Sequence, residues 1–314
     1  MADRLIGDIG GTHSRLALAG AGIRKVKVYD NAGFSGLDAI IADYLDRLDA
    51  ADRPTAAALA VACPVGSDRV HMTNLGWGFS IADYRRRFGL DALHVLNDFA
   101  AAALAIPALE QGDVVKIGAG EAVPGRPVGI IGPGTGLGVA SLVPCGQTWI
   151  PVAGEGGHVT LPPATDEEDR IIATLRRRRG HVSAERLISG PGLTLLYQVL
   201  AGTEDQAPAP EAITRQALSG EDALAVKALD HFLAMLGTVA GNLALTLGAQ
   251  GGIYLAGGIL PDLAGRLQDS PFRQRFADKG RYREYLEAIP TLLITRDYPA
   301  LLGLKRYLEG REAA

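Results

Sequence analysis

The sequence predicts an α/β protein made of two related halves that hold a ligand between them. Two glycine-threonine loops, about 125 residues apart, are the main observation behind this prediction. The first loop (Gly-Gly-Thr at 10–12) follows an apolar run at 5–9, and the second (Gly-Thr-Gly at 134–136) follows another at 128–133. Apolar alternation resumes after each loop, so each is expected to form the tip of a β-hairpin. Strand, loop and strand thus occur once in each half.

Hydrophobic periodicity predicts the other elements of the first half. Strands are expected near 3–8, 14–19, 24–30, 56–62 and 92–96, with short extended segments near 68–73. One apolar face predicts a helix after Ser35, and a shorter helix is expected after Ser80. Both serines are expected to act as N-caps, because a serine hydroxyl accepts a hydrogen bond from the first turn of a helix.

The second half begins with strands and continues mostly with helices. Strands are expected near 113–117, 127–132, 138–143 and 148–153, and a long helix over about 221–247. The polar, proline-containing stretch 202–210 is expected to be a surface loop. A buried strand at 253–256 leads into Gly257 and Gly258, followed by a strand near 291–295 and a helix after Pro299.

Composition excludes several classes of protein. The chain has 314 residues, enough for two domains, with 47 % hydrophobic and 21 % charged residues. A net charge of −4 argues against broad nucleic-acid binding, which requires a basic surface. The one dense basic run, 176–179, is interpreted as the solvated end of a helix, where cations complement the helix dipole.

The cysteines and the termini indicate a reducing compartment. Cys63 and Cys145 are the only cysteines, which excludes a disulfide framework and a cysteine-rich zinc cluster. The first strand begins by Leu5, too early for a signal peptide, and no apolar run approaches the length of a membrane span. A cytoplasmic protein with no membrane partner is expected.

The two loops together favour a nucleotide's phosphates. Glycines allow backbone N–H groups to approach an anion, and threonine adds a hydroxyl donor. Asp8, at the end of the first strand, adds a carboxylate suited to magnesium. No lysine follows either loop, so neither is a P-loop. A dinucleotide fingerprint also fails, because the third glycine would fall at Val139 or Leu137.

Three further segments carry candidate chemistry. Asn97 and Asp98 follow the strand at 92–96, where a carboxylate could take a proton from a substrate hydroxyl, although both residue types also cap helices. In the glycine-rich segment 154–158, Glu155 and His158 suit hydrogen bonding to a polyhydroxylated ligand, or the segment is a surface turn. Its three glycines make a helix, and so a zinc site on one, implausible. Glu185, after a possible N-cap at Ser183, could bind a ligand or only complement a helix dipole.

From end to end, over about 4–309, the chain resembles the bacterial glucokinases of the hexokinase type, within the superfamily of actin-like ATPases. The resemblance rests on six motifs in order: LIGDIGGTHSRLAL, LNDFAAAALAI, GPGTGLGVA, GEGGHVTLPP, HVSAERLISGPGL and IYLAGGI. The cysteine-rich zinc motif of the related repressor-kinase branch is absent, so the chain is similar to the zinc-free branch.

The resemblance implies a two-lobed, ribonuclease H-like fold and phosphorylation of the glucose 6-hydroxyl by ATP. A small α/β domain (2–108 plus 298–314) would close on a large one (109–297) across a ligand cleft. Asp98 would be the base, and Asn97, Glu155, His158 and Glu185 would hold the other hydroxyls. Gly10, Gly11, Thr12, Thr135 and Gly136 would enclose the ATP phosphates, Asp8 would orient Mg²⁺ through water, and Gly257 and Gly258 would border the adenosine. A homodimer is also implied.

Other classes of protein stay open on the sequence. An ATP-hydrolysing assembly module of the actin type shares both loops but needs no sugar pocket. A sugar-responsive regulator would bind without turnover, although no DNA-binding extension precedes Leu5. A nicotinamide dehydrogenase ranks lowest. The sequence leaves open the selectivity among hexoses and whether ADP or polyphosphate can replace ATP.

Overall fold

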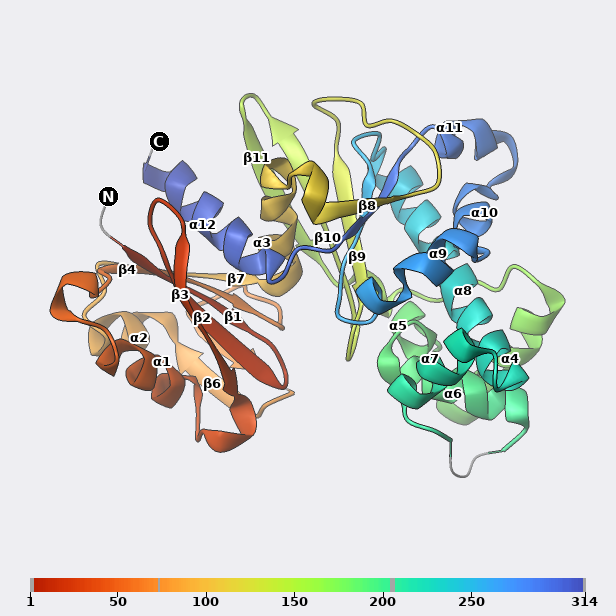
Figure 1. Cartoon of the computed structure of the whole chain (residues 1–314), viewed down its shortest axis with the longest axis horizontal. Coiled ribbons are helices and arrows are strands. Elements are labelled where there is room, and N and C mark those ends of the chain that lie inside the picture. The colour runs from red at the N-terminus through yellow and green to blue at the C-terminus, as the bar shows by residue number, and fades with distance from the viewer. Residues whose placement is uncertain (1–2, 73, 204–206, 313–314) are drawn as a thin grey trace. The chain divides into compact units, whose positions relative to one another are not determined.

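The computed structural model describes residues 3–72, 74–203 and 207–312. Contacts between Cα atoms divide the chain into two compact units (Figure 1). Unit 1 comprises Met1–Gln111, Pro151–Ala153 and Arg296–Ala314, and unit 2 comprises Gly112–Ile150 and Gly154–Thr295. The domains expected from the sequence, 2–108 plus 298–314 and 109–297, are defined as parts that move rigidly relative to each other. Their limits stay a prediction.

Unit 1 contains a five-stranded sheet in the order β3-β2-β1-β4-β7. Its strands are β1 (Arg4–Ile9), β2 (His13–Ala19), β3 (Ile23–Asp30), β4 (Ala56–Val61) and β7 (Ala92–Asn97). The β1 strand is antiparallel to β2 and parallel to β4, which is parallel to β7. The register aligns Ile9, Val61 and Asn97, so β1 and β7 end at the same edge of the sheet.

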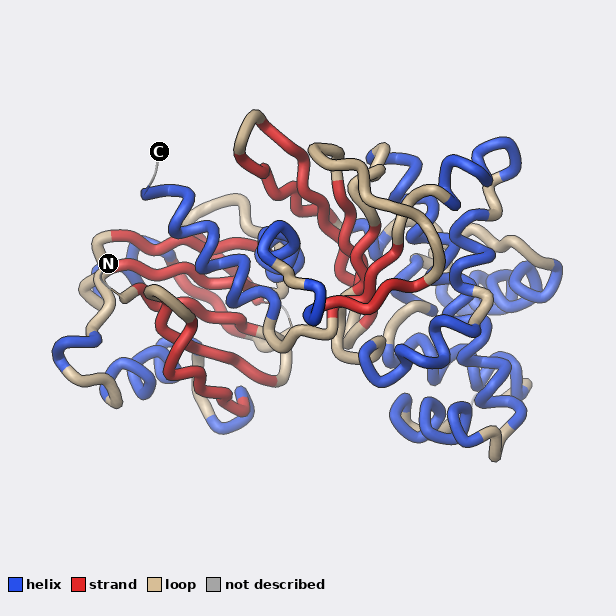
Figure 2. Tube along the Cα trace, turned by 45° about the horizontal axis from the view of Figure 1, so that its top comes forward, coloured by secondary structure: helices blue, strands red, loops and turns tan. Residues whose placement is uncertain are grey.

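Helices cover both faces of this sheet (Figure 2). The helices α1 (Leu37–Asp46) and α2 (Ile81–Arg87) pack on one face, and α3 (Asp98–Ala105) and α12 (Pro299–Glu312) on the other. The α3 and α12 helices are in close contact, because a Cβ at Gly303 would lie 1.7 Å from the Ala101 carbonyl oxygen. A separate hairpin is formed by β5 (Arg69–Met72) and β6 (Trp77–Ser80), while position 73 of the expected extended segment lies outside the described residues.

One of the two expected serine caps in unit 1 is confirmed. The Ser80 hydroxyl accepts a hydrogen bond from the Asp83 N–H and caps α2. The expectation for Ser35 is wrong, because α1 begins one residue later, with Gly36 as its N-cap and no side-chain cap bond. Serine is favoured at an N-cap but does not decide where the first turn begins.

Unit 2 repeats the strand arrangement of unit 1. Its sheet has the order β11-β10-β9-β12-β13-β8. The strands are β8 (Val114–Ile117), β9 (Val128–Pro133), β10 (Leu137–Cys145), β11 (Thr148–Gly154), β12 (Ile253–Leu255) and β13 (Thr291–Ile294). The β9 strand is antiparallel to β10 and parallel to β12, which is parallel to β13. The predicted relation between the halves is therefore confirmed in topology, and both glycine-threonine loops are hairpin tips.

The helices of unit 2 pack around the long helix α8 (Ala223–Leu247). They are α4 (Asp166–Arg179), α5 (Ala184–Leu187), α6 (Gly190–Ala201), α7 (Pro210–Ser219), α9 (Ala264–Asp269), α10 (Phe272–Ala277) and α11 (Arg283–Glu287). In the described part of the chain, only α8 is long and apolar enough to cross a membrane, but 67 % of its apolar window is buried. It is a core helix: a Cβ at Gly237 would lie 2.2 Å from the Phe272 carbonyl oxygen of α10.

The structure also describes the predicted helix end at 176–179 and most of the predicted loop at 202–210. The four arginines at 176–179 form the last turn of α4, and Gly180 follows as its C-cap, as expected. In the expected loop at 202–210, Gly202 ends α6 and Pro210 begins α7, while residues 204–206 lie outside the described residues.

Candidate active site

A buried asparagine holds the first glycine-threonine loop. The side-chain amide of Asn31 donates to the Gly10 carbonyl (2.9 Å), and its backbone N–H donates to the Thr12 carbonyl (2.9 Å). The side-chain oxygen Oδ1 of Asn31 accepts from the Ser14 hydroxyl (2.7 Å), and the residue is only 4 % exposed. Gly11 and Thr12 themselves are exposed at the loop tip. Nothing in the sequence distinguishes Asn31, because a single asparagine after a strand resembles any turn residue.

Asp8 lies near the end of β1, paired with an arginine of β2. Its carboxylate is 3.3 Å from Nη1 of Arg15, and its side chain is 17 % exposed. Burial raises the pKa of Asp8 above the ordinary aspartate value, and the charge of Arg15 opposes this shift. The Arg15 guanidinium also lies 4.9 Å from the ring centroid of Tyr298. A single carboxylate of this kind fits Mg²⁺, which is commonly bound by one or two carboxylates together with phosphates and waters.

Asn97 and Asp98 lie at the junction of β7 and α3. Because Asn97 is aligned with Ile9 across β4, this pair is about 10 Å, or two strand spacings, from the start of the first loop. The Asn97 side-chain oxygen accepts from the Ala100 N–H (3.1 Å), so its helix-cap role is confirmed. Asp98 is half-buried in the first turn of α3 and accepts from the Phe99 N–H (2.8 Å).

The second loop is fixed by the start of α6. The N–H of Gly190 donates to the Gly134 carbonyl (2.8 Å), and the Gly134 N–H donates to the Gly136 carbonyl (2.8 Å). Thr135 is exposed at the tip. Gly257 approaches the base of the loop with φ of +92°, and a Cβ there would lie 2.3 Å from the Pro133 carbonyl oxygen. This close approach requires glycine, whereas the space beside Gly258 is open.

Glu155 precedes a single 3₁₀ turn, Gly156–His158, and His158 is the last residue of that turn. The expectation that this segment forms no helix carrying both residues is confirmed, since glycine is unfavourable in a long helix but tolerated in an isolated 3₁₀ turn. A Cβ at Gly157 would lie 2.2 Å from the Leu137 carbonyl oxygen, so glycine lets the turn pack on the start of β10. The side chain of Glu155 is exposed.

Glu185 joins this turn to the second loop. Its carboxylate accepts from the Leu137 N–H (2.9 Å) and lies 4.0 Å from Nε2 of His158. The hydroxyl of Ser183 accepts from the Arg186 N–H (3.3 Å), which confirms the predicted cap of α5. Glu185 therefore does more than complement a helix dipole, since it accepts a hydrogen bond from Leu137, a residue 48 positions earlier in the chain.

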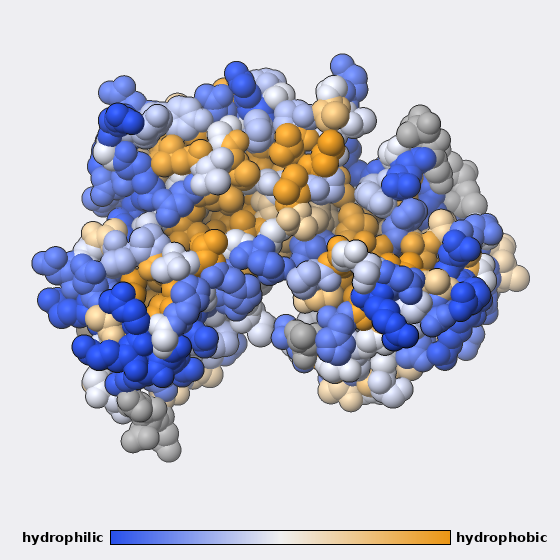
Figure 3. All heavy atoms as spheres, turned by 180° about the vertical axis from the view of Figure 1, so that it is seen from behind, coloured by the Kyte–Doolittle hydropathy of each residue, from blue (hydrophilic) through white to orange (hydrophobic). Residues whose placement is uncertain are grey.

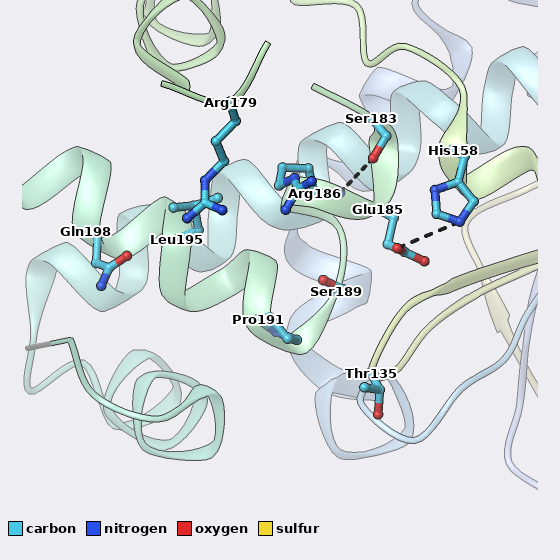
Figure 4. A pocket seen from close by; sticks show the side chains of 10 residues that line it. All are labelled: Thr135, His158, Arg179, Ser183, Glu185, Arg186, Ser189, Pro191, Leu195 and Gln198. Carbon is cyan, nitrogen blue, oxygen red and sulfur yellow. Dashed lines mark hydrogen bonds and ion pairs between the residues drawn. The ribbon is translucent and has the colours of Figure 1, made fainter. Parts of the chain in front are cut away.

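The second loop, His158 and Glu185 line one pocket of about 370 Å³ within unit 2 (Figure 4). Its lining residues are Thr135, His158, Arg179, Ser183, Glu185, Arg186, Ser189, Pro191, Leu195 and Gln198. Glu155, Gly257 and Gly258 do not line it. The pocket thus combines a candidate phosphate-binding threonine with two candidate sugar-binding side chains.

The sequence-predicted site residues are divided between the two units. Unit 1 carries Asp8, Gly10, Gly11, Thr12, Asn97 and Asp98, and unit 2 carries Thr135, Gly136, Glu155, His158, Glu185, Gly257 and Gly258. Within each unit, a glycine-threonine hairpin lies beside candidate polar groups. Among the residues that the structure describes, no group of three or more His, Cys, Asp or Glu side chains could hold a metal ion.

The repeated sheet topology with a hairpin loop in each unit defines the class of fold: the actin-like fold that sugar kinases share. The chain is similar in fold to a hexokinase of the ROK family from Thermus thermophilus, with a TM-score of 0.71, 18 % identity, and 99 % of each chain covered. At this identity the likeness concerns the fold alone.

Sequence comparison then identifies the family. The family model for glucokinase matches residues 5–311, and the chain belongs to the glucokinase family. It is 50 % identical over 305 residues to a glucokinase of Nitrobacter hamburgensis, covering 96 % of this chain and 95 % of the relative. The crystal structure of a glucokinase from an Antarctic psychrotroph is similar with a TM-score of 0.89 and 37 % identity, with 99 % of each chain covered. The protein catalyses the ATP-dependent phosphorylation of glucose to glucose 6-phosphate, the first step of glycolysis. This excludes the regulator, assembly-module and dehydrogenase alternatives.

Proposed function

We propose that Asp98 is the general base of this reaction. Its carboxylate would accept the proton of the glucose 6-hydroxyl while that oxygen forms a bond to the γ-phosphorus of ATP. The bond from this phosphorus to the bridging oxygen breaks, and ADP leaves with the electron pair. The observation that carries the proposal is the register of unit 1. It aligns the ends of β1 and β7, so the base and a phosphate loop share one sheet edge.

We propose that four other side chains orient the sugar: Asn97, Glu155, His158 and Glu185. Because the Asn97 oxygen already caps α3, its NH₂ group is the part that would donate to a sugar oxygen. Glu185 uses one carboxylate oxygen for the Leu137 N–H, so the oxygen nearer His158 would accept from a hydroxyl. Glu155, which is exposed, would supply a second anionic acceptor.

The nucleotide would be bound by the two glycine-threonine loops. Gly10, Gly11 and Thr12 would donate to the phosphates from one loop, and Thr135 and Gly136 from the other. Gly257 and Gly258 would border the adenosine, in keeping with the open space beside Gly258. Asp8 would orient Mg²⁺ through a water molecule, and the ion would neutralise charge on the transferring phosphoryl group.

We further propose a cytoplasmic homodimer whose two domains close on glucose to exclude water. The family resemblance supports the dimer, and Figure 3 shows one face on which hydrophobic side chains gather in patches on a largely hydrophilic surface. Exposed apolar side chains on β10 and β11 include Val143, Ile150 and Val152. Closure matters because water would otherwise compete with glucose as the phosphoryl acceptor.

The base assignment is tested by Asp98→Asn, which keeps the size of the side chain and removes its basicity. We expect kcat to fall by about 10²- to 10⁴-fold, the usual contribution of a general base. The glucose Kd, measured by calorimetry, should change far less than kcat. A variant with normal turnover would contradict the assignment. A variant that no longer binds glucose would show that Asp98 acts in binding instead.

A further inference from the structure

The pocket of unit 2 has a basic side that the proposed sugar and loop contacts do not use. Arg179, in the last turn of α4, and Arg186, on α5, both line it. Figure 4 shows their side chains between the His158–Glu185 pair and the α6 residues Leu195 and Gln198. A solvated helix end explains a cation in the last turn of α4 and in that of α5, but it does not explain why both arginines line one pocket.

Among the residues that the structure describes, no acidic side chain pairs with either of these two guanidinium groups. Within residues 3–72, 74–203 and 207–312, neither has an ion pair or a side-chain hydrogen bond. Glu185 is the one acidic residue that lines the pocket, and its carboxylate is already engaged by the Leu137 N–H and faces His158. Two positive charges therefore line one pocket, and no described residue forms an ion pair with either of them.

Several other polar groups around the two arginines already make hydrogen bonds within the protein. The hydroxyls of Ser183 and Ser189 accept hydrogen bonds from the first turns of α5 and α6. At the start of α6, the Gly190 N–H donates to Gly134, and Pro191 has no N–H. The guanidinium forks are thus the principal free donors on this side, and their planar geometry matches the oxygens of a phosphate.

We propose that Arg179 and Arg186 form a phosphate-binding subsite that holds the phosphate chain of the nucleotide. The subsite opens into the same pocket as Thr135, at the tip of the second loop. Pro191 and Leu195 add apolar surface beside it, which suits a nucleoside phosphate better than a sugar phosphate. The proposal rests on the ATP-dependent reaction and adds to it two residues that set affinity for the donor and for the ADP product.

The test compares phosphorylated and unphosphorylated ligands in Arg179→Gln, Arg186→Gln and the double variant. Calorimetry gives the Kd of ADP, adenosine, glucose and glucose 6-phosphate for each. We expect each single change to weaken ADP about tenfold and the double change more, while adenosine and glucose change less than about twofold. Arg176→Gln is the matched control: the same charge is removed from the same helical turn, but residue 176 does not line the pocket.

Each outcome decides the matter. Selective weakening of ADP supports the subsite and assigns it to the nucleotide, whereas selective weakening of glucose 6-phosphate would support the phosphate subsite but assign it to the sugar product. The proposed subsite would be overturned if the Kd for ADP were the same in the double variant, in Arg176→Gln and in the unaltered protein. Double variants with lysine separate charge from folding, since they should recover part of the ADP affinity. The unaltered protein's glucose phosphorylation, measured in parallel, shows whether the underlying reaction itself holds.

Discussion

Single residues in this protein act mainly by holding backbone in place. Asn31 uses its amide and its own N–H to hold two carbonyls of the first loop, and Gly157 lets a turn lie against the Leu137 carbonyl. Neither residue needs to touch a substrate. Both hold the backbone of segments that carry proposed ligand-binding groups, which explains why they have no recognisable chemical signature in the sequence.

Gly157→Ala should damage glucose binding more than ATP binding. The new Cβ would lie 2.2 Å from the Leu137 carbonyl oxygen, so the turn that carries His158 must move away from Glu185. We expect the glucose KM to rise at least about tenfold, equivalent to about 1.4 kcal/mol, while the ATP KM changes little. Gly154→Ala is the matched control, because a Cβ there meets nothing within 4 Å. Equal effects of the two substitutions would contradict this explanation.

At the scale of elements, a histidine of the unit 1 sheet contacts α12. His94 of β7 stacks edge-on against Tyr307 of α12, with ring centroids 5.4 Å apart. Burial lowers the pKa of His94 below the ordinary histidine value, and the positive charge of Arg311 on α12 lowers it further. A protonated His94 is therefore less favourable in the folded protein than in the unfolded chain.

The free energy of unfolding should accordingly decrease as the pH is lowered. Below about pH 6.5 the unfolded chain takes up a proton that folded His94 resists, so unfolding is favoured as the pH falls, by at most about 1.4 kcal/mol per pH unit. His94→Phe should remove this part of the pH dependence. Urea unfolding at pH 8 and pH 5.5 measures it. The pH 8 value serves as the control, since histidine is neutral there in both states, and an unchanged pH dependence in the variant would count against the assignment.

At the scale of the whole molecule, two sheets that share one strand arrangement each carry a glycine-threonine hairpin loop. In each unit the hairpin loop follows a strand with an antiparallel neighbour on one side and a parallel neighbour on the other. The parallel strands all end at the edge where the loop lies. This is the edge at which α/β sheets place their ligand-binding groups.

Glucose should make the protein more compact in solution. The proposed reaction requires side chains of both units to act on one glucose molecule, so binding should restrain the two units together. We expect small-angle scattering to show a smaller radius of gyration with saturating D-glucose, and no change with L-glucose, its mirror image. Asp98→Asn should still contract if that residue acts only as the base. An unchanged radius with D-glucose would contradict domain closure.

Much of the fold and the site could be predicted from the sequence, for reasons that differ from residue to residue. The hairpin loops at Gly10 and Gly134 could be predicted, because a glycine-threonine segment between two apolar strands is typical of a hairpin turn. Ser80 and Ser183 could be predicted as N-caps, because the capping hydrogen bond joins residues only three positions apart in the chain. The expectation for Ser35 was wrong, because α1 begins at Leu37 with Gly36 as its N-cap, and a capping preference does not decide where the first turn begins.

The sequence by itself determined the two halves, their hairpin loops and the candidate residues, since these depend on periodicity and on the chemistry of neighbours in the chain. Tertiary structure alone decided that Asn31 holds the first loop, that Glu185 binds the Leu137 N–H, and that Arg179 and Arg186 share a pocket. Each of these contacts joins separate segments of the chain. Local preferences cannot specify such contacts, because only the packing of sheets and helices brings the segments within hydrogen-bonding distance.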